Sequence, residues 1–338
     1  MAEAVSVVDV AARAGVSLGT VSNVLNRPEL VAAATRERVL QAVAELGYVR
    51  NEAARQLRSG RSRMIGLVVL DVGNPFFTDL AAGVEAAAAE ADLSVILCNS
   101  AESSDRESHY LNLLEQQRAY GVLITPVATK TPGLEAIRRR GTAVVLVDRG
   151  SSPRQCSVSV DDHVGGELAM AHLVACGHKR LCFVGGPLGL TQVSDRLAGA
   201  RDAVHGGGLR ADALTVVETA ALNVSAGRQA AAKIAETPAR RRPTAVFCAN
   251  DLLALGVLQE MTRRRLQVPR DIALVGYDDI EFAAAAAVPL TSVRRPRAQL
   301  GRTATELLIE EVTEPKPHRH RQVVFEPDLV ARESTIAS

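Results

Sequence analysis

The sequence of 338 residues contains no tryptophan, and only 3% of its residues are aromatic. It has no apolar run of the roughly 18 residues that cross a bilayer, and no basic start followed by an apolar stretch. We therefore expect neither a membrane span nor a signal peptide. Five cysteines, an odd number without Cys-x-x-Cys spacing, indicate free thiols in a reducing compartment. A cytoplasmic protein with no membrane partner is expected.

Net charge is also nearly absent from the chain as a whole. Basic residues number 39 and acidic residues 38, and the resulting net charge of +1 disfavours a nonspecific binder of nucleic acid or anionic membranes. The distribution is uneven, however, because residues 1–63 hold nine arginines and six acidic residues. A basic segment with a net charge of +3 is thus joined to a remainder with a net charge of −2.

From Ile65 onward, short apolar runs alternate with segments of helical periodicity. The runs predict buried strands at 65–70, 93–98, 121–125, 143–147, 181–185, 214–217, 244–248 and 272–276. Strands alternating with helices predict β-α-β units, arranged either in one wide parallel sheet or in two smaller ones. Because the connection at 149–161 is long and polar, we place a lobe boundary there. The expected fold is α/β and bilobal, with ligands bound beyond the carboxyl ends of the strands.

The segment before these strands has the pattern of short, capped helices. Ser6 is expected to cap a first helix ending at Gly15, and Ser17 to cap a second, LGTVSNVLN. Thr35 is expected to start a third helix that ends at Gly47. Two short helices joined by a glycine-containing turn and braced by a third predict a helix-turn-helix, whose second helix enters a DNA major groove. The helical pattern alone also fits a small bundle that serves as a dimerisation cap.

Two further features favour DNA binding. Thr20, Ser22, Asn23 and Asn26 place short hydrogen-bonding groups on the exposed side of the second helix, where they suit phosphate and base contacts. The next segment, RNEAARQLRSGRSR at 50–63, carries five arginines and one acidic residue.

A series of motifs extends along nearly the whole chain. It begins with VVDVAARAGVSLGTVSNVLNRPELVAAATRERVLQAVAELGYVRNEAARQLRSGRSRMIGLVV. It continues with DVGNPFF at 71–77, VDR at 147–149, GGPLGLTQVSDRLAGA at 185–200, RPTAVFCANDLLALG at 242–256, VGYDDIEFA at 275–283 and PLTSVRRPRAQLG at 289–301. In order and spacing, these motifs closely resemble those of the LacI/GalR family of bacterial regulators.

The resemblance implies an N-terminal all-α helix-turn-helix domain at 1–49 and a hinge helix with linker at 50–62. The core, 63–338, is then similar to a periplasmic binding protein, with two parallel β-sheets flanked by helices and a role in effector binding and dimerisation. The bounds implied for its lobes are about 63–161 plus 292–320 for the first and about 162–291 plus 321–338 for the second.

The implied function is that of a transcriptional regulator, with a repressor of a carbohydrate operon expected. Its partners would be palindromic operator double-stranded DNA, a small-molecule effector and a second copy of the chain in a homodimer. Effector binding is expected to release the operator. No cofactor is implied.

Carried over residue by residue, the resemblance assigns a set of DNA-binding positions. They are Ser6, Ser17, Leu18, Gly19, Thr20, Ser22, Asn23, Asn26, Thr35, Tyr48, Asn51, Ala54, Arg55 and Leu57. Leu57 matches a leucine that wedges between central base pairs, with Ala54 as its packing neighbour, although it also fits an ordinary linker leucine. Gly19 has no side chain to read a base, Leu18 offers only apolar contact, and Asn23 is suited to adenine.

The resemblance likewise implies an effector pocket. Its residues are Phe76, Asp148, Arg149, Leu190, Arg196, Leu222, Asn250 and Asp278. Carboxylates, an amide and a guanidinium around an aromatic platform suit a polyhydroxylated ligand. Leu190 and Leu222 stand where purine-binding members have an arginine and an aromatic residue, which favours a sugar. The alternative for Asp148 and Asp278 is that they only cap helices.

Two other sequence motifs, typical of hydrolases and of zinc sites, give weaker indications of function. The G-x-S-x-G at 15–19 follows a helix rather than the strand that a hydrolase nucleophile needs, so Ser17 is interpreted as a cap. The spacing His172-x3-Cys176-x-His178-x3-Cys182 resembles a zinc motif, but Cys182 opens a core strand, and no metal site is expected. A solute-binding protein without DNA function and an α/β enzyme acting on sugars remain competing hypotheses; the N-terminal arginine bias opposes the first and the lack of a positioned nucleophile the second.

Overall fold

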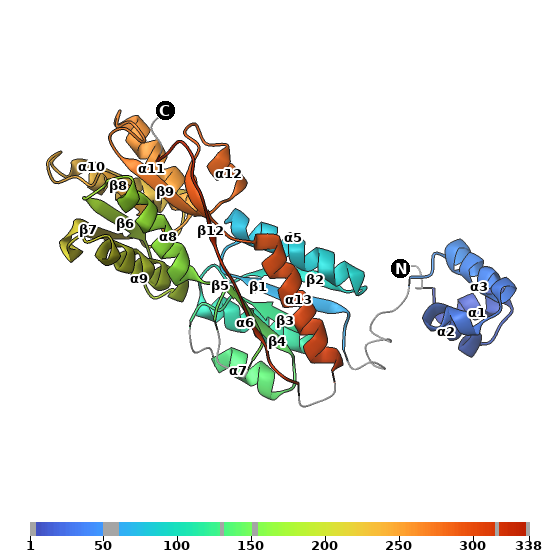
Figure 1. The fold of residues 1–338 in the computed structure, drawn as a ribbon. Helices are drawn as coiled ribbons and strands as arrows, with labels where there is room; N and C mark the ends of the chain where they lie inside the picture. The colour runs from blue at the N-terminus through green and yellow to red at the C-terminus, as the bar shows by residue number, and fades with distance from the viewer. Residues whose placement is uncertain (1–4, 50–60, 129–131, 151–154, 315–317, 336–338) are drawn as a thin grey trace. The chain divides into compact units, whose positions relative to one another are not determined.

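The computed structural model describes residues 5–49, 61–128, 132–150, 155–314 and 318–335 (Figure 1). The chain divides into two compact units, the first ending at Ser62 and the second beginning at Arg63. None of the helices in the described ranges combines the length and apolar character needed to cross a membrane.

The first unit is a small helical domain. Its elements are α1 (Val7–Ala14), α2 (Leu18–Asn26), the 3₁₀ helix η1 (Pro28–Leu30) and α3 (Ala33–Leu46). Ser6 caps α1 in a reciprocal arrangement with Asp9, and the Ser17 hydroxyl accepts the Thr20 N–H at 3.1 Å, as predicted. The expectation that Thr35 starts α3 is wrong, because the helix begins two residues earlier, without a side-chain cap. The buried core consists of Val10, Ala11, Ala14, Val21, Val24, Val39 and Ala42.

The second unit contains two lobes, each built on a six-stranded sheet. The first sheet is wholly parallel, in the order β11-β5-β4-β3-β1-β2. Its strands are β1 (Met64–Val69), β2 (Ser94–Asn99), β3 (Gly121–Ile124), β4 (Val144–Val147), β5 (Ser157–Val160) and β11 (Gln322–Phe325). Its helices are α5 (Pro75–Glu90), α6 (Ser104–Gln116), α7 (Pro132–Arg139) and α13 (Arg297–Thr313).

Alternation along β1 explains the layers of this lobe. Leu67 faces one side of the sheet and packs with the apolar residues of α5 and α13, whereas Val68 faces the other side and packs with those of α6 and α7. Both sheet faces are therefore covered, as near-continuous apolar strands predict.

The second sheet has the order β12-β10-β9-β8-β6-β7, and only β12 is antiparallel to its neighbour. Its strands are β6 (Leu181–Gly185), β7 (Leu214–Glu218), β8 (Ala245–Cys248), β9 (Ala273–Asp278), β10 (Thr291–Arg294) and β12 (Asp328–Val330). Its helices are α8 (Asp162–Ala175), α9 (Thr191–Gly206), α10 (Val224–Glu236), α11 (Asp251–Arg263) and α12 (Glu281–Ala284), with the 3₁₀ helix η2 (Ala211–Ala213). α8 and α9 lie on one face, and α10 and α11 on the other (Figure 1).

The chain passes between the lobes after β5, after β10 and after β11. This corrects two expected lobe bounds. β10 pairs with β9, so the first lobe resumes after Arg294 and not at 292. β11 pairs with β5, so 322–325 belong to the first lobe, not the second. The two final strands are short and adjacent in sequence, and their sheets are determined by pairing partners more than 30 residues away, which periodicity does not reveal.

Candidate DNA-binding surface and effector pocket

The predicted recognition helix α2 buries one side and exposes the other. Val21 and Val24 lie in the core, whereas Leu18 is 49% exposed and Asn23 is also exposed. The Asn26 amide donates to the backbone carbonyl of Ser22 at 2.7 Å, so it is partly used within the helix. The exposed side therefore offers the Asn23 amide, which is suited to adenine, and the apolar side chain of Leu18 at the start of the helix, which is suited to a thymine methyl.

The remaining predicted DNA-binding residues lie at the margins of this domain. Gly19 is exposed in the first turn of α2, and Thr20 and Thr35 are half-buried. Tyr48 packs against the core of the domain just after α3. Four predicted positions, Asn51, Ala54, Arg55 and Leu57, lie outside the described residues.

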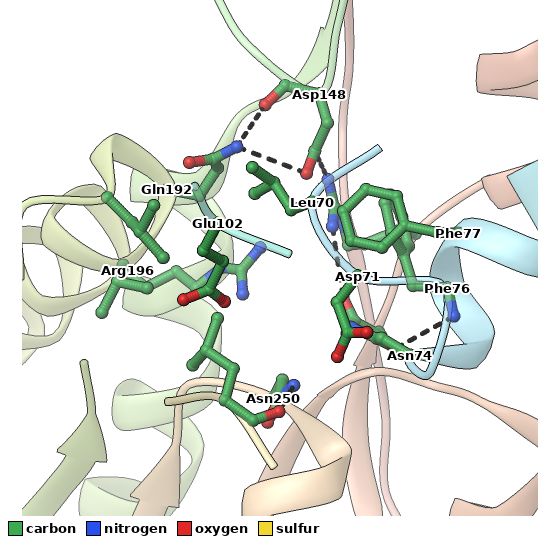
Figure 2. Close-up of a pocket in the computed structure, with 15 residues that line it drawn as sticks. Leu70, Asp71, Asn74, Phe76, Phe77, Glu102, Asp148, Gln192, Arg196 and Asn250 are labelled. Carbon is green, nitrogen blue, oxygen red and sulfur yellow. Dashed lines mark hydrogen bonds and ion pairs between the residues drawn. The ribbon is translucent and has the colours of Figure 1, made fainter. Parts of the chain in front are cut away.

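The second unit encloses a pocket between its lobes, with about 500 Å³ of space including the solvent at its mouth. The cavity itself has a volume of about 40 Å³, which is smaller than a typical small-molecule site, so a ligand has to displace side chains that fill the space between the lobes. Figure 2 shows the side chains converging from both lobes. The lining residues are Leu70, Asp71, Asn74, Phe76, Phe77, Glu102, Asp148, Leu190, Gln192, Val193, Arg196, Leu222, Asn250, Asp278 and Arg295.

Two buried carboxylates occupy equivalent positions in the lobes. Asp148 follows β4 and Asp278 ends β9, the fourth strand from the same edge in each sheet. Both residues have a positive φ, 57° and 102°, a conformation that costs energy outside glycine and often marks functional positions. Neither caps a helix; Asp161, Asn250 and Ile280 hold the N-cap positions of α8, α11 and α12.

Arg196 is fixed by contacts within the second lobe. Its Nε donates to Asp162 at 2.8 Å, its Nη1 donates to the Ala249 carbonyl at 2.6 Å, and its guanidinium lies 3.8 Å from the Tyr277 ring centroid. The Tyr277 hydroxyl donates to the same Asp162 oxygen at 2.8 Å. Close packing supports this network, because a Cβ at Gly166 would lie 2.0 Å from the Arg196 carbonyl oxygen.

Arg295 is a pocket residue that sequence reasoning missed. Its guanidinium forms an ion pair with Asp148 and another with Asp278, at 3.2 Å, so it joins carboxylates of both lobes. It also lies 4.0 Å from the Phe76 ring centroid, on the aromatic face predicted to stack on a ligand. Burial raises the pKa of Asp278 to about 7 and lowers the pKa of Arg295 to about 9. The charge of the pocket therefore changes near neutral pH, where Asp278 ionises.

Other contacts also hold the lobes together. The Gln192 amide donates to the Asp148 carbonyl at 2.8 Å, as the dashed lines in Figure 2 show. Asn74 caps α5 by accepting the Phe76 N–H at 3.0 Å. Sequence reasoning missed Asn74 and Gln192 as lining residues, although each belongs to a motif quoted for the resemblance.

The predicted pocket residues are largely brought together. Phe76, Asp148, Leu190, Arg196, Leu222, Asn250 and Asp278 line the cavity. Arg149 does not line it. It is buried beside the pocket, where burial lowers its pKa against the opposing effect of Glu107 and Asp195. The positive φ of Asp148 turns that side chain into the pocket, and the next residue along the chain is directed elsewhere.

Comparison with known proteins identifies both parts of the chain. Residues 6–51 match the description of bacterial regulatory proteins of the lacI family, and residues 170–335 that of a periplasmic binding protein-like domain. The ribose operon repressor of Escherichia coli is 36% identical over 329 residues, with 96% of this chain and 98% of that protein covered. The transcriptional repressor PurR of Aliivibrio fischeri is 33% identical over 331 residues, 97% of each chain.

A solved structure extends the likeness to three dimensions. The lac repressor dimer bound to operator and the anti-inducer ONPF is matched with a TM-score of 0.86 at 28% identity, covering 99% of this chain and 100% of that one. The fold and these comparisons define a DNA-binding transcriptional regulator with a small-molecule-binding core. The chain belongs to the LacI family of bacterial regulatory proteins.

Proposed function

We propose that this regulator represses a carbohydrate operon and that a monosaccharide, for which ribose is the first probe, enters the pocket and releases the operator. The observation that carries this proposal is the set of polar groups around the cavity. Asp148 and Asp278 are suited to accept hydrogen bonds from sugar hydroxyls, and the remaining N–H groups of Arg196 and Asn250 are suited to donate to them. The name of the ribose operon repressor supports the same class of ligand.

A purine effector is the second candidate, because relatives named PurR are of similar identity. The pocket argues against it. Leu190 and Leu222 are aliphatic lining residues that offer neither a donor to a base edge nor a stacking surface, and the Phe76 face already contacts Arg295. A sugar depends more on hydrogen-bonding partners for its hydroxyl groups than on a stacking surface, and the pocket has more polar side chains than accessible aromatic faces.

The effector class is tested by thermal shift of the untagged full chain with ribose, other monosaccharides, cellobiose and a purine base. Binding stabilises the folded state by mass action, so a concentration-dependent rise in the midpoint is expected with a monosaccharide. Asp278→Asn should remove the rise, whereas Asp279→Asn should retain it, because Asp279 pairs with Arg294 and Arg332 away from the lining. A rise with the purine base and with no sugar would refute the proposal.

Operator binding is tested by electrophoretic mobility shift with DNA from upstream of the chain's own operon. Replacing Asn23 by alanine should weaken binding by about 1–3 kcal/mol and relax the preference at one base pair of each half-site. Gln41→Ala on α3, whose amide bonds to Glu45 at 2.9 Å, is the matched control and should leave the shift unchanged. A chain without DNA function, such as a plain solute-binding protein, would give no sequence-dependent shift at all.

We further propose that the chain acts as a homodimer on palindromic operator DNA in the cytoplasm. The edge strand β2 supports a self-contact, because Ile96 and Leu97 are 38% and 43% exposed on it. Light scattering should give the mass of a dimer at micromolar concentration, and Leu97→Glu should shift the mass toward a monomer. A monomer of the unaltered chain would contradict the proposal.

The allosteric link follows from the chain path. Three crossings join the lobes, and Arg295 and Gln192 hold the pocket faces together. A sugar that replaces these contacts changes the relative stability of lobe orientations, by no more than its difference in affinity for the two. Adding the effector to the mobility shift should weaken the complex; a strengthened complex would make the effector a co-repressor.

A further inference from the structure

Four side chains converge at the amino-terminal ends of strands β5 and β11 in the first sheet, opposite the carboxyl ends that face the pocket. Cys156 immediately precedes β5, His318 and His320 precede β11, and Glu311 lies in the last turns of α13. One ligand-type atom from each residue lies within 4.8 Å of all the others. These residues, which we call the edge cluster, play no part in the DNA surface or the pocket.

The spacing of the edge cluster is close to that of a tetrahedral metal site. Cys156 Sγ lies 3.2 Å from His318 Nε2 and 3.7 Å from His320 Nδ1, and His320 Nδ1 lies 3.9 Å from Glu311 Oε2. Around a tetrahedral zinc ion, ordinary bond lengths place a sulfur and a nitrogen ligand about 3.6 Å apart and a nitrogen and an oxygen ligand about 3.4 Å apart. Small side-chain shifts would therefore bring all four atoms to bonding distance.

Burial leaves one polar atom of the edge cluster without a hydrogen bond. Cys156 is fully buried, and the His318 side chain is 6% exposed. Glu311 Oε2 is buried and accepts no hydrogen bond from the described part of the chain. Because a buried carboxylate oxygen that accepts no hydrogen bond is costly, this atom fits the role of a ligand to a cation.

Neighbouring groups orient the ligands. His318 Nδ1 lies 2.7 Å from a Glu314 carboxylate oxygen, so the carboxylate fixes the tautomer in which Nε2 carries its lone pair toward Cys156. The Arg321 N–H donates to Cys156 Sγ at 3.5 Å and helps to hold the sulfur in place. A carboxylate behind a histidine ligand is the arrangement that metal sites use to hold the imidazole ring in place.

We propose that the edge cluster binds one Zn²⁺ per chain through Cys156, His318, His320 and Glu311. A thiolate with two imidazoles selects zinc over magnesium or calcium, and four protein ligands make a closed, structural site. The Cys156 thiol gives its proton to solvent as the Zn–S bond forms. The ion joins the end of α13 and the segment before β11 to the start of β5, and so fixes the edge strand β11, after which the chain crosses to the second lobe.

The expectation that the chain has no metal site is thereby revised. The spacing weighed at first, around His172 and Cys176, does not converge on an ion: His172 bonds to Thr335 at 2.8 Å, and Cys182 is buried within β6. The sequence does not reveal the edge cluster, because 162 residues separate Cys156 from His318. Its one local signal is His-x-His directly before a strand, a spacing that places both rings on the same side.

The test uses the untagged full chain, stripped with a chelator and then loaded with ZnCl₂. After gel filtration, elemental analysis should give one zinc per chain, and zinc should raise the thermal midpoint. Cys156→Ser and His320→Gln should each lose the bound zinc and the midpoint shift. Cys176→Ser, which changes an exposed cysteine elsewhere, should retain both. A substoichiometric zinc content in the unaltered chain, or equal loss in the Cys176 variant, would overturn the proposal.

Cobalt provides a readout that does not depend on how well any variant folds. Co²⁺ added to the stripped, unaltered chain should give the intense visible bands of tetrahedral cobalt and a thiolate-to-cobalt charge-transfer band, both displaced by one equivalent of Zn²⁺. Weak bands of octahedral cobalt without a thiolate contribution would refute the ligand set. Cys156→Ser should lose the charge-transfer band specifically.

Discussion

The two lobes of the core have the same strand order but differ at both ends of their strands, which we call the amino-terminal and carboxyl-terminal edges of each sheet. From β2 in the first lobe and from β7 in the second, each sheet has three crossover-connected parallel neighbours, then the strand that leaves the lobe, then a final strand from the C-terminal region. The one topological difference is the last strand, which is parallel in the first lobe and antiparallel in the second.

At the amino-terminal edge, the two lobes have different kinds of polar side chains. In the second lobe, the residues after β12 form a neutral hydroxyl network, in which Thr291 Oγ1 lies 2.7 Å from Thr335 Oγ1 and Ser334 Oγ accepts the Thr291 N–H at 2.8 Å. In the first lobe, the edge cluster of thiol, imidazole and carboxylate groups takes that place and leaves Glu311 Oε2 without a hydrogen bond. Protein groups alone satisfy one edge, whereas the other is suited to an added ion.

At the carboxyl-terminal edge, the lobes differ in whether the contacts of a pocket side chain come from its own lobe or from outside it. Arg196 is held by Asp162 and Tyr277 of its own lobe. Asp148 of the first lobe instead contacts Gln192 of the second lobe and Arg295 of the crossing segment. Arg196 therefore gives the second lobe a fixed binding face, while the carboxylates Asp148 and Asp278 both depend on Arg295 and hence on closure. This is the asymmetry that a ligand needs in order to influence lobe orientation.

The largest expected effect tests the fixed face. Arg196→Met leaves Asp162 buried without its cation, and breaking a buried pair in this way should lower the free energy of unfolding by about 3–5 kcal/mol. Arg201→Met, on the exposed side of the same helix, is the matched control and should change nothing measurable. Urea titration followed by circular dichroism measures both, and similar losses in the two variants would show that the network does not hold the lobe.

The next effect concerns pH, because adjacent aspartates at the end of β9 titrate in opposite directions. Burial raises the pKa of Asp278 to about 7. Burial also pulls the pKa of Asp279 upward, but hydrogen bonds from Arg332 and Arg294 hold it below its usual value. The stability that Asp278 contributes is therefore present below pH about 4 and is lost as the pH rises to about 7, whereas that of Asp279 is lost as the pH falls below about 4.

Unfolding free energies measured across this range should separate the two. Asp278→Asn should flatten the decline between pH 4 and 7, which for one proton has a slope of at most about 1.4 kcal/mol per pH unit. Asp279→Asn should instead reduce the loss on the acid side. An unchanged slope in Asp278→Asn would mean that the carboxyl group is ionised throughout and that the second lobe's binding face carries a fixed charge.

Local features of the fold could be predicted from the sequence, because their causes lie within a few residues. Ser6 and Ser17 cap helices through contacts three residues away, and strands such as β4 are apolar on both faces. Asp148 could be predicted as a pocket position because it follows a buried strand, at whose carboxyl end ligands of α/β sheets bind. Asp278 is assigned by resemblance to the family.

The rest depends on contacts between distant parts of the chain. Arg295 lies in the pocket because it pairs with Asp148, 147 positions earlier, and nothing in the local sequence distinguishes it from its neighbours Arg294 and Arg297. The sheets to which β11 and β12 belong, and the meeting of Cys156 with His318, have the same origin. Periodicity reports which face of an element is buried, but not against which partner.

A smaller effect tests the closed amino-terminal edges. Thr291→Val removes a buried hydroxyl that donates to the Arg332 carbonyl at 3.0 Å and accepts the Arg332 N–H at 2.8 Å, and it should cost about 1–3 kcal/mol whether or not zinc is present. Cys156→Ser should lower stability mainly in the presence of zinc, because it removes a ligand and no comparable network. Denaturant titrations with and without chelator measure both; a zinc-dependent loss in Thr291→Val would erase the contrast between the edges.

The smallest effect concerns a second arginine–carboxylate pair at the equivalent helix packing. In the first lobe, Arg302 on α13 forms two hydrogen bonds with Glu90 at the end of α5, at 3.0 and 2.9 Å. Its geometry is as good as that of Arg196 with Asp162, but the side chains are 40% and 66% exposed. Exposed pairs contribute little because water and salt screen them and ordering the side chains offsets the attraction.

A double-mutant cycle with Arg302→Met and Glu90→Gln should therefore give a coupling that denaturant titration does not separate from zero at physiological ionic strength. The cycle with Arg196→Met and Asp162→Asn should give a clear one, because the partner left behind is desolvated. Since both pairs join the helix after the first central strand to the helix that crosses from the other lobe, burial is the main variable between them. Equal couplings would mean that helix packing, and not desolvation, sets the strength of these pairs, and the fixed face of the second lobe would then need another explanation.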